Sequence, residues 1–131
     1  MDRKIVLVDD DKVTLRYIEH FLVGNLFSVQ TALDGETALE LVKREKPSIL
    51  VSDLVLPKLD GVELCKRVKE NPDLKQTKVI LMSAAYMGAT LRSVARDCGA
   101  DAYVSKPIRS TDLLEKIYKL SAEADSPEER K

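Results

Sequence analysis

The segment Lys4-Ile5-Val6-Leu7-Val8-Asp9-Asp10 decides the fold, because it is a short apolar run that ends abruptly on carboxylates. Such runs are typical of strands buried on both faces of a parallel sheet. Three more segments have the same design: Ser48-Ile49-Leu50-Val51-Ser52-Asp53, Lys78-Val79-Ile80-Leu81-Met82-Ser83 and Ala102-Tyr103-Val104-Ser105-Lys106. Because ligands bind at the carboxyl ends of the strands in an open parallel sheet, we expect a functional site where these runs end.

The polar residues at these four ends predict a site for phosphoryl chemistry. If the strands lie side by side, three carboxylates, one hydroxyl and one ammonium converge there: Asp9, Asp10, Asp53, Ser83 and Lys106. Three close carboxylates repel one another, so the cluster needs a hard divalent cation. An all-oxygen ligand set suits Mg²⁺. The convergence therefore predicts a magnesium site beside a candidate nucleophile.

Helical patterns separate the strands, which is the signature of a parallel sheet built from βα repeats. A strand at residues 27–32 lies between the first two helical patterns. Asp34 is a plausible N-cap of the second helix, and Asp60-Gly61 is expected to open the third. The pattern predicts five strands and five helices in one domain, residues 1–121. Residues 122–131 carry no apolar pattern, so we expect a polar tail or the start of a linker there.

The composition adds bounds but no second function. With 131 residues, 44% of them hydrophobic and a net charge of −1, the chain suits one globular domain and asks for no nucleic-acid or membrane partner. No apolar run approaches a membrane span, and the first residues lead into a strand rather than a signal peptide. Cys65 and Cys98 lack the paired spacing of a zinc or redox motif. These features indicate a soluble cytoplasmic protein.

The motifs, taken in order, resemble the receiver domain of bacterial two-component response regulators. The resemblance covers roughly residues 3–120 and rests on Val8-Asp9-Asp10-Asp11, Asp53 with Pro57, Asp60-Gly61, Ser83-Ala84, Gly99-Ala100-Asp101 and Lys106-Pro107. It implies an α/β, doubly wound (βα)5 fold, a flavodoxin-like three-layer sandwich with strand order 2-1-3-4-5. It also implies a phosphorylation-activated signalling switch, not an enzyme in its own right, that assists its own phosphorylation and dephosphorylation. The resemblance further implies a cis peptide bond between Lys106 and Pro107.

Asp53 is the best candidate phosphoacceptor, because it stands alone at a strand end that faces the acidic pair. A carboxylate that attacks phosphorus forms an acyl phosphate, a known kind of covalent intermediate. Asp10 is the expected direct Mg²⁺ ligand, and Asp9 is expected to act through water. The resemblance adds a side-chain oxygen of Asp53 and the backbone carbonyl of Val55 as ligands.

The remaining site residues are expected to contact the phosphoryl group or to report its presence. Lys106 would pair with one phosphoryl oxygen, and Ser83 would donate a hydrogen bond to another. By the resemblance, Ser83 then moves and the ring of Tyr103 fills the vacated space, which changes the surface of the fourth helix, fifth strand and fifth helix. Taken alone, Tyr103 is also an ordinary strand residue, Ser83 an ordinary helix cap and Lys106 an ordinary surface lysine.

The implied partners are a sensor histidine kinase or histidine phosphotransfer protein upstream, and an output domain or downstream protein. A small phosphodonor and a homodimer through the fourth helix, fifth strand and fifth helix remain open. Whether the domain stands alone or is part of a longer protein also remains open. A phosphatase of the haloacid-dehalogenase type would need a second Asp at position 55, which is Val55. A flavodoxin-type binder would need a phosphate-binding glycine motif. A phosphorylation-independent interaction module is the main alternative.

Two departures from the family pattern carry expectations of their own. Val55 and Ala85 are apolar where many relatives are polar, so the phosphoryl group should persist longer than in those relatives. Ser83 and Lys106 lie 23 positions apart (106 − 83), about one more than the family pattern. The extra residue is expected in a loop at residues 86–90, before the fourth helix.

Overall fold

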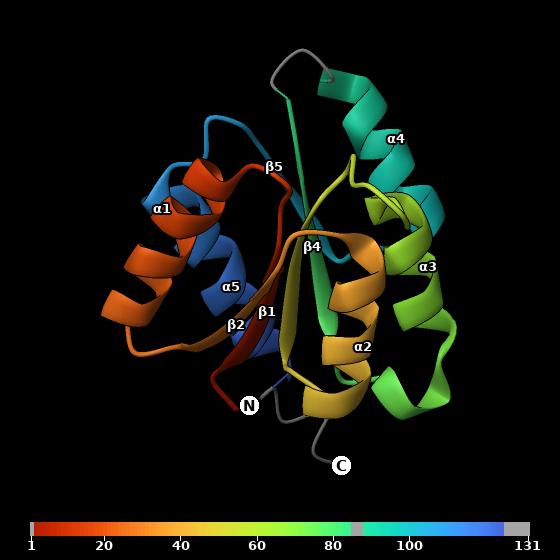
Figure 1. Ribbon diagram of the computed structural model, residues 1–131, viewed down its shortest axis with the longest axis horizontal. Coiled ribbons are helices and arrows are strands. Elements are labelled where there is room, and N and C mark those ends of the chain that lie inside the picture. The colour runs from red at the N-terminus through yellow and green to blue at the C-terminus, as the bar shows by residue number, and fades with distance from the viewer. Residues whose placement is uncertain (1, 85–87, 125–131) are drawn as a thin grey trace.

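The five strands form one parallel sheet in the order β2-β1-β3-β4-β5, as the family resemblance implies. A computed structural model describes residues 2–84 and 88–124. The strands are β1 (Lys4–Val8), β2 (Ser28–Ala32), β3 (Ile49–Asp53), β4 (Lys78–Ser83) and β5 (Ala102–Ser105). Helices cover both faces, with α1 (Lys12–Gly24) and α5 (Ser110–Ala124) on one side and α2 (Gly35–Glu45), α3 (Gly61–Glu70) and α4 (Gly88–Cys98) on the other (Figure 1).

Alternate strand residues face two separate apolar cores. Val6 of β1 points to the core under α2, α3 and α4, while Ile5 points to the core under α1 and α5. Because both faces are covered, every residue of β3 is buried, including the polar Ser52 and Asp53. The continuous apolar runs of the sequence are therefore explained by burial on both faces.

Aspartates cap the first turns of three helices. All three helices begin at the edge of the sheet where the strands end. Asp11, Asp34 and Asp60 have extended backbones, and their side chains accept hydrogen bonds from the first-turn amides of α1, α2 and α3. Such caps satisfy backbone donors that the helix itself leaves unpaired. The predictions for Asp34 and Asp60 are confirmed, and Gly99 ends α4 with φ +85°.

Some predicted boundaries differ from the structure. The second strand begins at Ser28, and a short 3-10 helix, Pro72–Leu74, follows α3. A loop was predicted at residues 86–90. This prediction is wrong for residues 88–90, which are helical, while Ala85 and Tyr86 lie outside the described residues. Helix α5 continues to Ala124, into the segment that was expected to be a polar tail or the start of a linker, because alanines favour the helix. Within the described residues, no helix combines the length and apolarity that crossing a bilayer requires.

Candidate functional site

The sheet register brings the four predicted strand ends to one edge. Val8 of β1 pairs with Ser52 of β3, so Asp9 and Asp53, the next residues along, lie at adjacent strand ends. Ser83 of β4 pairs with Ser105 of β5. The backbone amide of Lys106 donates to the Ser83 carbonyl at 2.6 Å, which ties the last two ends together. The sequence-predicted residues are thus gathered at a single place by parallel pairing alone.

Asp9, Asp10 and Asp53 form an acidic cluster with ligand oxygens within 4.8 Å of one another. The side chains differ in exposure, because Asp9 is fully buried, Asp53 is nearly so and Asp10 is exposed. Oδ1 of Asp9 accepts a hydrogen bond from the backbone amide of Asp11 at 2.9 Å. Three carboxylates at this separation supply both the charge and the all-oxygen donors that a hard divalent cation requires. The residues present fit Mg²⁺.

Lys106 bridges the two buried carboxylates. Its Nζ lies 2.9 Å from Oδ2 of Asp9 and 3.1 Å from Oδ2 of Asp53. Partial burial lowers the pKa of the Lys106 ammonium, but the hydrogen bonds to Asp9 and Asp53 outweigh it, so this pKa is raised. Lys106 is therefore a charged contact of the site, and not the exposed loop lysine of the alternative interpretation. Its peptide bond to Pro107 is cis, as the resemblance implies.

Asp53 lies in an environment that opposes its charge. Burial raises the pKa of its carboxyl, the hydrogen bond from Lys106 lowers it, and the nearby charge of Asp9 raises it again, with a net rise. One cation in contact does not fully offset the burial and the neighbouring carboxylate. A further positive charge beside Asp53 would favour its ionised form, which is the form that attacks an electrophile.

The other predicted site residues occupy distinct positions. Ser83 is buried at the end of β4, close to Lys106, while Val55 is 71% exposed in the loop after Asp53. Tyr103 is partly buried on β5, and its hydroxyl accepts a hydrogen bond from Nε of Arg92 at 3.1 Å. The role of Arg92 was not expected from the sequence, because nothing in a helical pattern indicates which strand residue it will contact.

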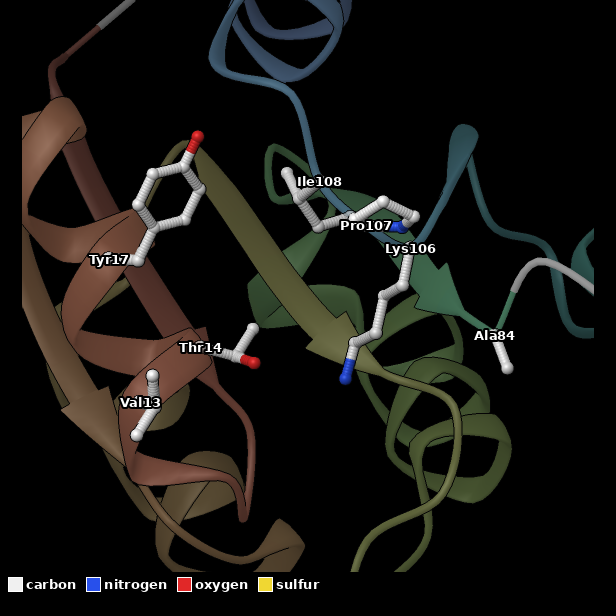
Figure 2. Close-up of a pocket in the computed structure, with 7 residues that line it drawn as sticks. All are labelled: Val13, Thr14, Tyr17, Ala84, Lys106, Pro107 and Ile108. Atoms are coloured by element: carbon white, nitrogen blue, oxygen red, sulfur yellow. The ribbon is translucent and has the colours of Figure 1, made fainter.

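An apolar groove of about 620 Å³ opens beside Lys106. Side chains from α1 form one wall, and the segment after β5 together with Ala84 forms the other (Figure 2). The groove was not predicted from the sequence, although two apolar residues of α1 indicate it. Val13 and Tyr17 lie four residues apart on α1, outside the buried stripe, and they are 78% and 51% exposed. They offer apolar contacts within reach of the acidic cluster.

The chain was compared with known proteins. Residues 5–118 match the family model described as the response regulator receiver domain. The response regulator MprA of Mycobacterium leprae is 37% identical over 117 residues, which cover 89% of this chain and 50% of that protein. The chain thus spans about half the length of that relative. A putative response regulator from Chloroflexus aurantiacus has a TM-score of 0.87 and 29% identity, covering 93% of this chain and 99% of its own. A BeF3-activated DrrB receiver domain has a TM-score of 0.79 and 33% identity, covering 92% and 98%.

Proposed function

The chain belongs to the response regulator receiver domain family, and on this premise we propose that it is a phosphorylation-activated signalling switch with Asp53 as the acceptor. The observation that supports this most strongly is the surplus of negative charge at Asp9, Asp10 and Asp53 beside a single contacting lysine. A carboxylate oxygen of Asp53 would attack the phosphorus of a phosphohistidine or acetyl phosphate. The new O–P bond forms as the bond to the donor breaks, and the donor leaves with that electron pair.

The metal expected at this site is Mg²⁺, held by Asp10 and Asp53 directly, by Asp9 through water and by the Val55 carbonyl. The exposed Asp10 and the buried Asp9, already bonded to Asp11 and Lys106, support this division of roles. A bound Mg²⁺ offsets the charge on the transferring phosphoryl group, which is most of what such transfer needs. The chain's own contribution is to hold the acceptor oxygen and the donor groups in place.

Lys106 and Ser83 would read the presence of the phosphoryl group. The Lys106 ammonium already contacts Asp53 and can pair with a phosphoryl oxygen by a small movement. The Ser83 hydroxyl would donate to another oxygen. Because Lys106 is bonded to the Ser83 carbonyl, a shift at one strand end is passed to the other. Tyr103, two strand residues before Ser105, is then the expected point where this local change reaches the surface.

We assign the proposed partners to two surfaces of the domain. A protein phosphodonor would bind the groove beside Lys106, where exposed Val13 and Tyr17 supply apolar contact next to the acceptor. An output domain, a downstream protein or a second copy would bind the face of α4, β5 and α5. Arg92 and Arg96 are exposed on α4 of that face. If the domain dimerises there on activation, beryllofluoride should raise the sedimenting mass, and charge reversal at Arg92 or Arg96 should weaken the effect.

Mg²⁺-dependent labelling separates this function from a phosphorylation-independent interaction module. The protein is incubated with acetyl phosphate and excess Mg²⁺, and its intact mass is measured. We expect the mass of one phosphoryl group to be added, and we expect chelation of Mg²⁺ or Asp10→Ala to prevent the addition. An interaction module would gain no mass under any of these conditions, and that result would contradict the proposal.

A further inference from the structure

The loop between β3 and α3, residues 54–60, carries Val55 and starts directly after Asp53. Both of its ends are fixed by backbone hydrogen bonds. The Leu54 amide donates to the Met82 carbonyl at 2.8 Å, and the Gly61 amide donates to the Leu54 carbonyl at 2.9 Å. In the middle of the loop Leu56 is buried in the core, and the exposed residues on either side of it are held by a further neighbour.

That neighbour is the amino end of α2. The Gly35 amide donates to the Pro57 carbonyl at 3.3 Å. A Cβ built on Gly35 would overlap the carbonyl oxygen of Leu59 and would lie 2.6 Å from its carbonyl carbon. Only a glycine permits this approach, because the obstacle is backbone and not the movable end of a side chain. Lys58 adds a weak electrostatic contact, with its Nζ 3.9 Å from the carboxylate of Asp34.

A side chain at position 35 would displace the loop rather than the helix. Helix α2 is anchored by Ala38 and Val42, which are both fully buried. Pro57 and Lys58 are exposed, and Lys58 has a φ of +69°, a conformation that costs energy in a residue with a side chain. Leu54 and Leu56 anchor the loop in the core, so the exposed residues Val55, Pro57 and Lys58 are the parts of it that can yield when Leu59 is pushed.

We propose that Gly35, remote in sequence from Asp53, is a positioning residue for the phosphorylation site, because its close contact with Leu59 and Pro57 holds the loop that carries Val55. The inference rests on the proposed function, in which the Val55 carbonyl is a ligand. Gly35→Ala moves that carbonyl and leaves Asp53 in β3, where its backbone is paired with β4. The defect is therefore in Mg²⁺ binding more than in the reactivity of the acceptor.

The test is a titration of the folded protein with Mg²⁺ alone, followed by amide chemical shifts, together with labelling by acetyl phosphate. For Gly35→Ala we expect the half-saturating Mg²⁺ concentration to rise about tenfold, the lower end of what losing an outer support of a metal site costs. The labelling rate at saturating Mg²⁺ should fall by no more than about threefold. The matched control is Gly24→Ala, because a Cβ on Gly24 meets nothing within 4 Å. Its titration should match the wild type.

Two further variants keep the proposal open to refutation. Gly61→Ala would overlap the Asp53 carbonyl itself, so it should reduce both Mg²⁺ affinity and the saturating labelling rate. Pro57→Gly frees the loop without any steric overlap, and it should raise the half-saturating concentration about threefold even if Gly35→Ala does not fold. An unchanged half-saturating concentration in folded Gly35→Ala, or in Pro57→Gly, overturns the positioning role alone. A wild type that shows no Mg²⁺-dependent shifts overturns both the role and the proposed function.

Discussion

Two lysine–carboxylate clusters lie at opposite edges of the same sheet, and they are built differently. At the amino edge of β5, Nζ of Lys69 lies 2.8 Å from Oδ2 of Asp101 and 3.3 Å from the Thr77 carbonyl. The same Asp101 oxygen accepts the Val79 amide at 2.8 Å. One cation there meets one anion, and backbone groups complete the coordination. At the carboxyl edge, Lys106 contacts two carboxylates, and a third lies within 4.8 Å of both.

If the proposed function is correct, the difference separates a structural contact from a functional one. The Lys69 cluster pairs one positive charge with one negative charge, so it would not attract a further ion. It connects the end of α3 to the start of β5. The Lys106 cluster retains an excess of negative charge, which a divalent cation would offset, so that the site could then accept an anionic phosphoryl group. A polar cluster that its own residues leave incomplete is a better candidate for function than one of equal size that is balanced.

The contrast between the two clusters is tested first by Lys106→Ala, for which we expect the largest effect. The variant should still be labelled by acetyl phosphate, but about tenfold more slowly, because a positioned charge on a phosphoryl oxygen is lost at a partly exposed site. Its amide shifts around Leu91, Tyr103 and Leu113 should not change with beryllofluoride as they do in the wild type. Wild-type-like shifts in Lys106→Ala would contradict its role in switching.

Lys69→Met is the matched variant at the balanced cluster. Loss of its charged hydrogen bonds should lower the free energy of unfolding by about 1–2 kcal/mol, because Asp101 keeps only its backbone partner. Labelling by acetyl phosphate should stay within about twofold of the wild type. Chemical denaturation and intact mass measure the two quantities. A loss of labelling comparable to that of Lys106→Ala would show that the two clusters do not divide stability and function as stated.

Much of this contrast could be predicted from sequence, because each strand end is a local pattern and parallel pairing does the rest. The patterns at Asp53 and Ser83 needed only the correct strand order to be placed together. The contacts between Lys69 and Asp101, between Arg92 and Tyr103 and between Gly35 and Leu59 could not be predicted. They join residues from separate elements, and no periodicity or cap marks their partners. Helix α5 runs to Ala124, into the segment expected as a polar tail or linker, because a polar sequence rich in alanine can extend a helix without an apolar stripe.

A smaller effect is expected on the lifetime of the acyl phosphate. The Val55 side chain offers a water molecule neither a hydrogen-bond donor nor a hydrogen-bond acceptor, and it is exposed in the loop directly after Asp53. An amide there could orient the attacking water, so Val55→Asn should speed decay a few-fold, far below the 10²–10⁴ of complete acid–base assistance. The decay is followed by mass after removal of acetyl phosphate. The matched control is Val13→Asn in the groove, which should not alter decay. An unchanged or slower rate in Val55→Asn counts against the idea.

The smallest effect concerns stability, and its sign tests the charge surplus. A carboxyl with a raised pKa stabilises the fold only while protonated, and this contribution is lost as pH rises through the folded-state pKa. Asp53 has such a raised pKa, chiefly from burial. Without Mg²⁺, Asp53→Asn should therefore be more stable than the wild type at neutral pH, and the gain should vanish below the ordinary value of 3.8. Asp101→Asn should instead be less stable at neutral pH. Thermal unfolding at several pH values distinguishes these outcomes.

The most direct test of the central claim is the intact mass of wild type and Asp53→Asn after incubation with acetyl phosphate and Mg²⁺. The asparagine keeps the shape of the side chain but removes the nucleophilic carboxylate, while Asp9, Asp10 and Lys106 remain. We predict one added phosphoryl group on the wild type and none on Asp53→Asn. A stoichiometric phosphoryl group on Asp53→Asn, or none on the wild type, would contradict the assignment of Asp53 as the acceptor.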